Sequence, residues 1–255
     1  MNRCRVLLDQ PASGPWNMAV DEALVENSRV TGVPVLRLYG WQEATLSLGY
    51  FQGSAVPARF GRLPLVRRLS GGGAIVHHHE VTYSLCIPAG HPLAVQPSRL
   101  YRRVHEGIAA ALMALGVILD ARGEATLDSD SDEQSAPLST LNVQPFLCFL
   151  RRNPDDLVRA GSKVAGSAQR RRRGALLQHG SLVLAASPGA PEVIGLCELT
   201  HVELSLACVR QRLVKHVLEC VHLRAEAAQL EDNERRLAAH LASAKYGARC
   251  WNLRR

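Results

Sequence analysis

The amino-acid sequence predicts an α+β fold in which strands precede most of the helices. Segments rich in Val, Leu and Tyr at 33–41, 44–50, 65–69 and 74–88 predict strands. Beyond Pro191, apolar residues recur at helical spacing. Strands grouped before helices are typical of α+β proteins and not of a regularly alternating parallel sheet.

Two helices are predicted among these early strands. A helix over 16–28 follows Pro15, whose missing amide donor costs nothing at a helix start. An amphipathic helix over 97–115 ends at Gly116, where glycine is favoured. The next segment, 122–140, combines acidic residues with Ser, Thr and Gly and is almost free of apolar side chains. We expect it to be a solvated, mobile insert.

The rest of the chain is expected to complete the same domain. We predict ordered segments at 145–150, 156–168 and 175–185, with Lys163 on a strand in the second, and helices over 191–198, 205–220 and onward to Lys245. This gives a main domain at 1–190, which contains the insert, and a helical extension at 191–255 packed on it.

Composition excludes several classes of protein. No run of 18 apolar residues occurs, which excludes a membrane span, and the N-terminus lacks a secretory signal, so we expect a cytosolic protein. The 7 cysteines form no CxxC pair, which argues against a zinc knuckle and a redox dithiol. We expect no metal site.

The net charge of +7 indicates an anionic partner, either nucleic acid or an acidic protein. Nucleic acid is the weaker hypothesis, because aromatic residues are few and none are interleaved with the arginines. The basic run Arg170–Arg173 has two interpretations of about equal weight. It is either a solvated loop or a binding surface for an acidic partner.

The densest local signal is Arg67–Ala74, which contains the glycine run Gly71–Gly73. Three glycines allow a ligand to approach the backbone closely and leave the backbone N–H groups accessible to it. The alternative interpretation is a tight hairpin turn, since glycines also mark turns. No Lys-Ser/Thr pair follows, so this is not a P-loop.

Three further features have both a functional and a structural interpretation. His77–His79 suggests metal binding, but only alternate side chains of a strand share a face, and nothing completes a ligand set. Lys163 lies between glycines and next to Val164, either partly desolvated for chemistry or exposed on an edge strand. Cys148 has apolar neighbours, and residue identity alone favours a core cysteine.

Five motifs, taken in order, resemble the biotin/lipoate protein ligase superfamily, specifically lipoate–protein ligase A and the LipM-type octanoyltransferases. They are Asn17–Leu24, Arg67–Ala74, His77–Ser84, Lys163–Arg170 and Leu177–Leu182, with a weaker echo at Lys245–Tyr246 and Trp251–Asn252. The resemblance implies a central mixed sheet flanked by helices, of the type of class II aminoacyl-tRNA and biotin synthetases, with the main domain catalytic.

The resemblance also implies the site residues. Lys163 matches the essential lysine of the family, and His179 the histidine of its HGS motif. The positions expected to line the substrate pocket are Arg68, Ser70, Gly71, Gly72, Gly73, Ala74, Ile75, Val76, His77, Gly166, His179 and Gly180. One departure is His78, where the family usually has Asp.

Two chemistries occur in this superfamily. Ligases use ATP and Mg²⁺ to form lipoyl-adenylate, whereas the octanoyltransferases need no such cofactor and carry octanoate on a cysteine. Cys148 lies 15 residues before Lys163, the spacing of the LipM-type nucleophile. The segment His77–Ser84 resembles the transferase motif, and little more than helices is expected after Leu184, where ligases have an accessory domain.

We therefore expect a transferase that takes an octanoyl or lipoyl group from acyl carrier protein through a Cys148 thioester. The acceptor would be a lysine of a lipoyl-accepting domain, such as the glycine cleavage H protein. An ATP-dependent ligase is the alternative. A non-catalytic protein that binds acyl groups or carrier domains is more remote, because such a binder needs neither Cys148 nor Lys163.

Overall fold

The computed structural model describes residues 2–120, 145–151, 153–200 and 202–254. The acidic insert predicted at 122–140 lies outside these described residues. No helix within them is long and apolar enough to cross a membrane.

A mixed sheet of seven strands forms the centre of the molecule, in the order β10-β1-β2-β6-β9-β8-β7. Strand β1 pairs in parallel with β10 and β2, and the remaining neighbours pair antiparallel. The strands are β1 (Asn2–Leu8), β2 (Val35–Tyr39), β6 (Glu80–Ile87), β7 (Leu157–Arg159), β8 (Ser162–Arg172), β9 (Ala175–Val183) and β10 (Leu223–Ala227). A second sheet has the order β4-β3-β5, from β3 (Thr45–Leu48), β4 (Leu65–Arg67) and β5 (Ile75–His77).

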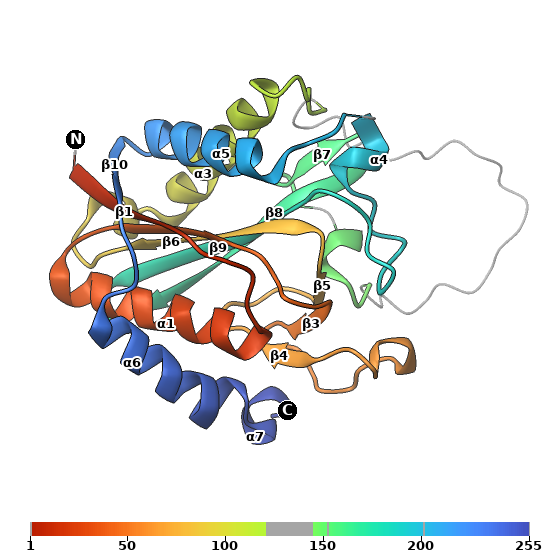
Figure 1. Ribbon diagram of the computed structural model, residues 1–255, viewed down its shortest axis with the longest axis horizontal. Helices are drawn as coiled ribbons and strands as arrows, with labels where there is room; N and C mark the ends of the chain where they lie inside the picture. Colours follow the sequence, from red (N-terminus) through yellow and green to blue (C-terminus); the bar gives the residue numbers. More distant parts are fainter. Residues whose placement is uncertain (1, 121–144, 152, 201, 255) are drawn as a thin grey trace, which may run out of the picture.

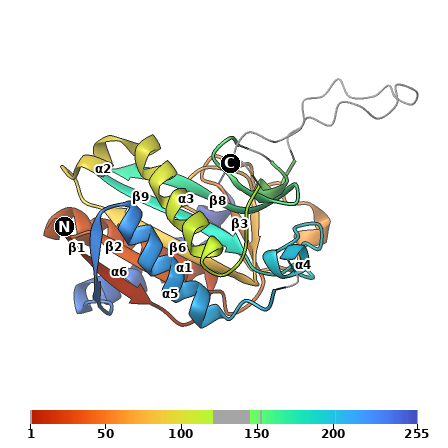
Figure 2. The same ribbon diagram turned by 90° about the horizontal axis from the view of Figure 1, so that it is seen from above.

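Helices cover both faces of the large sheet (Figures 1 and 2). One core packs α3 (Pro97–Met113) and α5 (Leu206–Cys220) on one face, and a second core packs α1 (Gly14–Thr31) and α6 (Asp232–Leu241) on the other. Alternate residues of a strand point to opposite faces. Leu36 accordingly joins the first core and Val35 the second.

Short helical segments complete the chain. They are η1 (Ala58–Phe60), α2 (Pro92–Val95), η2 (Cys148–Leu150), α4 (Leu196–Thr200), η3 (Ala242–Tyr246) and α7 (Arg249–Asn252). A small third core, which includes Leu46, Phe60 and Leu147, lies under the three-stranded sheet. It also contains Ala74, so the residue that follows the glycine run and the residue that precedes η2 share one core.

The predicted α+β class is confirmed, but several elements differ from the prediction. Strand β1 was not predicted, and β10 lies in the extension expected to be helical. The predicted helix at 191–198 is reduced to α4. The strand predicted over 74–88 is interrupted at His78–His79, between β5 and β6. Long-range pairing with β1 decides β10, because its Ala- and Glu-containing sequence favours a helix locally.

Candidate active site

A pocket with an open mouth lies where the glycine run, η2 and strands β8 and β9 meet. Its empty volume is about 480 Å³, its open mouth included, and most of its lining is apolar. Ten of the residues predicted for the site line it: Arg68, Gly71, Gly72, Ile75, His77, Cys148, Lys163, Gly166, His179 and Gly180. Met18, Tyr39 and Phe149 add apolar wall that was not predicted.

The position of Cys148 is fixed by the glycine run. Its backbone N–H donates to the Ala74 carbonyl at 2.7 Å, and the Ala74 N–H donates to the Phe146 carbonyl at 3.0 Å. These two bonds hold η2 against residues 73–74 and leave the Cys148 thiol half-buried at the pocket wall. The core-cysteine interpretation is therefore wrong.

Lys163 faces Cys148 across the pocket. Its Nζ lies 3.9 Å from the Cys148 Sγ and 2.8 Å from the Asp156 Oδ2, with both ion-pair side chains buried. The edge-strand interpretation is wrong, because β8 lies inside the sheet between β9 and β7. Burial raises the pKa of Asp156, and the Lys163 ammonium opposes that rise. An ammonium at this distance stabilises a thiolate.

Two glycines create the space for this pair. A Cβ on Gly166 would lie 2.5 Å from the Lys163 Cε, and one on Gly180 would lie 2.5 Å from the Gly166 carbonyl oxygen. Gly72 has a φ of +94°, a left-handed conformation that favours glycine. A Cβ at Gly72 would contact the Cys148 Sγ at 3.8 Å, so the backbone lies directly against the thiol.

Arg68 organises the glycine run from beneath. Its NH1 donates to the Ser47 carbonyl and hydroxyl oxygens at 2.8 and 2.6 Å, and its NH2 donates to the carbonyls of Gly71 and Gly73 at 3.1 and 2.9 Å. Burial lowers the pKa of Arg68 to about 10. The guanidinium is thus occupied by three backbone carbonyls and the Ser47 hydroxyl.

His77 connects Arg68 to a second buried network. Its Nε2 lies 2.7 Å from the Ser47 Oγ and its Nδ1 lies 2.7 Å from Glu80, while Trp41 stacks on the ring at 3.9 Å. Burial lowers the pKa of His77 and outweighs the attraction of Glu80. A neutral ring fits these partners, because Nδ1–H donates to Glu80 and Nε2 accepts from Ser47.

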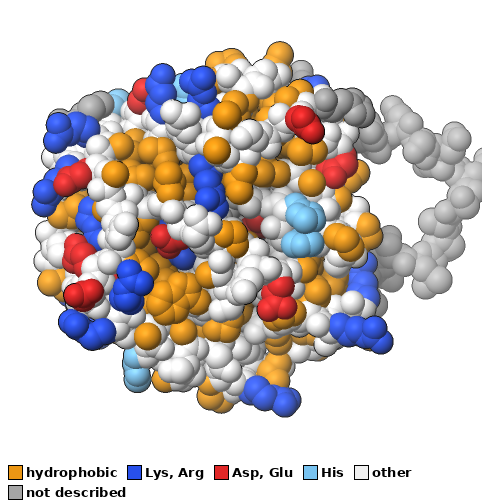
Figure 3. Space-filling view, viewed as in Figure 1, with side chains coloured by type: hydrophobic (Ala, Val, Ile, Leu, Met, Phe, Trp, Pro, Cys, Tyr) orange, Lys and Arg blue, Asp and Glu red, His pale blue; other side chains and the backbone are white. Residues whose placement is uncertain are grey.

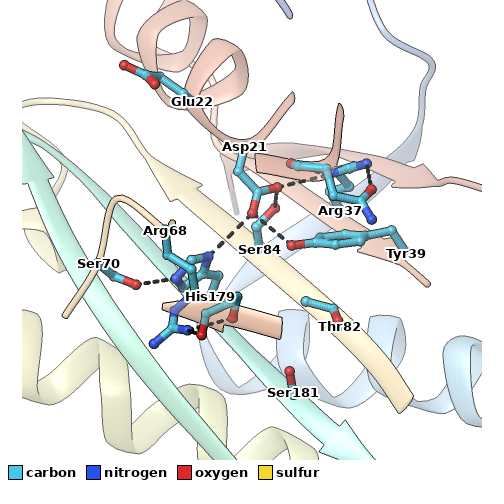
Figure 4. Close-up of polar contacts among 12 residues, drawn as sticks. Asp21, Glu22, Arg37, Tyr39, Arg68, Ser70, Thr82, Ser84, His179 and Ser181 are labelled. Atoms are coloured by element: carbon cyan, nitrogen blue, oxygen red, sulfur yellow. Dashed lines mark hydrogen bonds and ion pairs between the residues drawn. The ribbon is translucent and has the colours of Figure 1, made fainter. Parts of the chain in front are cut away.

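His179 is held by a third network (Figure 4). Its Nδ1 lies 3.4 Å from Asp21, and its Nε2 contacts the Ser70 Oγ closely. Asp21 also accepts hydrogen bonds from Arg37 and Tyr39, both at 2.9 Å. Burial alone would raise the pKa of Asp21, but His179 and Arg37 outweigh it, so the pKa is lowered. Ser70 is fully buried and cannot reach a substrate, so this Ser–His–Asp chain ties the glycine run to β9 and α1.

Four predicted residues do not line the pocket: Ser70, Gly73, Ala74 and Val76. The first three support the pocket from behind, through the bonds described above. Val76 points to a separate hollow beside His78 and His79. The ring of His78 stacks on His79 at 3.7 Å, and no group of three possible metal ligands occurs among the described residues.

The structure divides the basic run Arg170–Arg173. Arg172 forms ion pairs with Glu26 at 2.8 Å and Glu22 at 3.3 Å, and Arg171 donates to the Ala94 carbonyl at 2.9 Å. Arg173 is exposed. The run is therefore partly structural, which neither interpretation of the sequence anticipated.

Sequence reasoning missed Asp156, Asp21 and Ser47, which hold Lys163, His179 and Arg68. Asp21 lies inside the motif Asn17–Leu24, where a carboxylate on an apolar helix face was the available signal. Nothing local distinguishes Asp156 from Asp155 beside it.

Residues 13–217 match the Lipoyl protein ligase A/B catalytic domain family. The chain belongs to this family. Within it, the octanoyltransferase LipM of Kyrpidia tusciae is 33% identical over the full length of both chains. The octanoyltransferase LipM of Bacillus subtilis is 31% identical over 96% of this chain and 95% of its own.

Solved structures share the fold of this family member. Lipoate–protein ligase A bound with ATP superposes with a TM-score of 0.76 at 22% identity and covers 99% of both chains. The structure of a bi-partite lipoate protein ligase and its E2 lipoyl domain from Thermoplasma acidophilum gives a TM-score of 0.75 at 20% identity, over 99% of this chain and 97% of that chain. The predicted superfamily is confirmed, and with it the fold of the lipoate ligases.

Proposed function

We propose that this chain is an octanoyltransferase that carries the octanoyl group as a thioester on Cys148 and delivers it to a lysine of a lipoyl-accepting protein. The observation that carries the mechanism is the Lys163 Nζ, 3.9 Å from the Cys148 Sγ, in a mostly apolar pocket. The full-length LipM relatives support octanoyl transfer as the activity.

The first half-reaction loads the enzyme. The Cys148 thiolate attacks the thioester carbonyl of octanoyl-acyl carrier protein, and the carbon–sulfur bond of the donor breaks. Lys163 gives its proton to the departing thiolate. The octanoyl chain then occupies the apolar pocket, and Cys148 and Lys163 are both neutral.

The second half-reaction restores the pair. A lysine amine of the acceptor, such as the glycine cleavage H protein, attacks the octanoyl carbonyl, and the bond to Cys148 breaks. Lys163 accepts the proton of the amine, so that the ammonium and thiolate return. Backbone N–H groups of the glycine run or near Lys163 stabilise the oxyanion in both steps.

The commitment of Arg68 supports chemistry without ATP. An adenylate-forming site has to neutralise phosphates, and guanidinium groups are well suited to that task. In this pocket Arg68 donates to oxygens of Ser47, Gly71 and Gly73 instead. The other Lys or Arg in the lining, Lys163, is paired with Asp156.

Mass spectrometry after mixing with octanoyl-acyl carrier protein tests the proposal. One octanoyl adduct, labile to hydroxylamine, is expected on the peptide that contains Cys148. The Cys148→Ser variant should lose transfer or trap a stable ester, because serine is a much weaker nucleophile at neutral pH.

Cys197→Ser is the matched control, since this thiol is also half-buried but lies outside the pocket. It should behave as the unmodified protein. Three results would contradict the proposal: an adduct on Cys197, acceptor labelling that requires octanoate plus ATP, as in a ligase, or carrier binding with no turnover.

A further inference from the structure

A second hollow adjoins the acyl pocket at Lys163. Its empty volume is about 500 Å³, its open mouth included, and its lining is mainly polar. Lys163 and Phe149 line both this hollow and the acyl pocket. The remaining lining residues are Leu150, Gly161, Ser162, Glu192, Val193 and Ile194.

The rim of this hollow is apolar and exposed. Leu150 is 43% exposed and Ile194 39% exposed, and they come from η2 and from the loop that precedes α4. Exposed aliphatic side chains beside a hollow are common at protein-binding surfaces.

The loop that carries Glu192 and Ile194 is braced on both sides. The Val193 N–H donates to the Ala190 carbonyl at 3.0 Å, and the Gly195 N–H donates to Glu198 at 2.9 Å. Arg59 of η1 forms an ion pair with Glu192 at 2.6 Å. The hollow is therefore formed before any partner arrives, which reduces the entropic cost of binding.

Chemistry requires two approaches to the same thioester. Once the octanoyl chain fills the apolar pocket, an incoming amine needs a path to Lys163 that does not displace that chain. The second hollow has Lys163 in its lining, and the Nζ of this residue lies 3.9 Å from the Cys148 Sγ that carries the thioester. A lysine ammonium, with an ordinary pKa of about 10.4, arrives charged. It releases one proton to solvent at the open mouth and attacks as the neutral amine, whose second proton passes to Lys163.

Charge in the hollow suits this occupant. Glu192 offers a carboxylate to an arriving ammonium, and Lys163, which is neutral after the loading step, lies in the same lining. A polar lining with an apolar rim fits a charged side chain that protrudes from a protein surface.

We propose that the second hollow receives the acceptor lysine, with Leu150 and Ile194 contacting the residues that flank it. This inference rests on the proposed function and assigns the acceptor a surface separate from the acyl pocket. It predicts that changes at the rim affect the second half-reaction and leave the first intact.

Two variants test it. Ile194→Arg places a cation and extra bulk on the rim, and Glu192→Gln removes the carboxylate with little change in shape. Met113→Arg is the matched control, since Met113 is an exposed apolar residue at the end of α3 and lies outside both hollows.

The two half-reactions are measured separately, as octanoyl loading of Cys148 from octanoyl-acyl carrier protein and as transfer from preloaded enzyme to the acceptor. Both rim variants should load within about twofold of the wild type, while Ile194→Arg should raise the acceptor KM about tenfold, the scale expected for a contact near an interface centre. Glu192→Gln should raise it less, and Met113→Arg should change neither quantity.

Each contrary result has a distinct meaning. Normal loading with an unchanged acceptor KM in both variants would overturn the inference and leave the proposed function standing. Slow loading in both would assign the hollow to the donor and also overturn it. Absence of a Cys148 adduct in the wild type would overturn the proposed function, and this inference with it.

Discussion

Single residues in the pocket wall owe their charge states to burial and to a few fixed partners. His77 is enclosed by Trp41, Ser47 and Glu80, and burial lowers its pKa despite the nearby carboxylate. A base whose pKa is lower in the folded state than in the unfolded state binds fewer protons when folded. The contribution of His77 to stability is therefore fully present above the unfolded pKa of about 6.5 and declines as the pH falls below it.

This predicts that stability declines between pH 7.5 and pH 5.5, and that His77→Asn weakens the decline. Asn keeps an N–H donor for Glu80 and cannot be protonated in this range. Thermal unfolding at both pH values measures the effect. The variant should lose about 2–4 °C less than the wild type on acidification, the shift that ~1 kcal/mol gives in a protein of this size. Equal losses in both proteins would show that His77 does not titrate this way.

The sequence predicted the residues that face the pocket better than those that hold them. Cys148, Lys163 and His179 were expected from family motifs, whereas Asp156 was not. Asp156 reaches Lys163 because β7 and β8 pair with a register shift between Leu157 and Val158, a feature that follows from the packed sheet and not from local sequence.

Among the elements, the paired strands β8 and β9 carry many of the side chains and glycines that line the acyl pocket. Gly166 pairs with Ser181, and Gly180 with Ser167, so the two glycines lie on neighbouring positions of adjacent strands. The missing side chains leave room for the Lys163 side chain in the sheet surface. Glycine in a strand costs stability, and here it gives space to a functional group.

Gly166→Ala is accordingly predicted to impair transfer more than folding. The new Cβ would lie 2.5 Å from the Lys163 Cε and 2.8 Å from its Nζ, and the flexible side chain would move away from Cys148. We expect kcat to fall about 100-fold, the effect of an ångström-scale displacement of a reacting group, with little change in melting temperature.

Gly53→Ala is the control, because a Cβ there would have no neighbour within 4 Å. It should leave kcat unchanged. A near-normal kcat for Gly166→Ala would show that Lys163 tolerates displacement, or that its position near Cys148 is not required.

Element prediction failed where pairing is long-range. Strands β1 and β10 pair in parallel although they lie far apart in the sequence, and neither was predicted. The Ala- and Glu-containing sequence of β10 favours a helix locally. Strands β2 and β3 are close in sequence but belong to different sheets. Strand β6 lies within the strand predicted at 74–88, because its sequence is rich in the β-branched, aromatic and aliphatic residues that favour strands. Strand β9 lies within 175–185, where the sequence predicted only an ordered segment.

At the scale of the whole molecule, the net charge of +7 favours encounter with acidic protein partners. Lys and Arg side chains are spread among apolar and neutral ones on the face drawn in Figure 3 and do not gather into one patch there. We infer that attraction comes from the summed field together with individual arginines near the site. Arg170, whose guanidinium lies 4.5 Å from the Tyr50 ring, follows the pocket-lining Ala168 on β8.

The basic run should therefore separate into steering and structural arginines. Arg170→Ser combined with Arg173→Ser is predicted to raise the KM for octanoyl-acyl carrier protein about two- to fivefold, since exposed ion pairs contribute only ~0.2–1 kcal/mol. The salt dependence of that KM should flatten, because exposed charges are screened over about 8 Å at physiological ionic strength.

Arg172→Ser should instead lower the melting temperature, because Glu22 and Glu26 lose a partner, with a smaller effect on KM. With KM measured from about 50 to about 300 mM salt, an unchanged KM in the double variant would show that Arg170 and Arg173 do not attract the carrier protein. The attraction of the partner would then have to arise from charge elsewhere on the molecule.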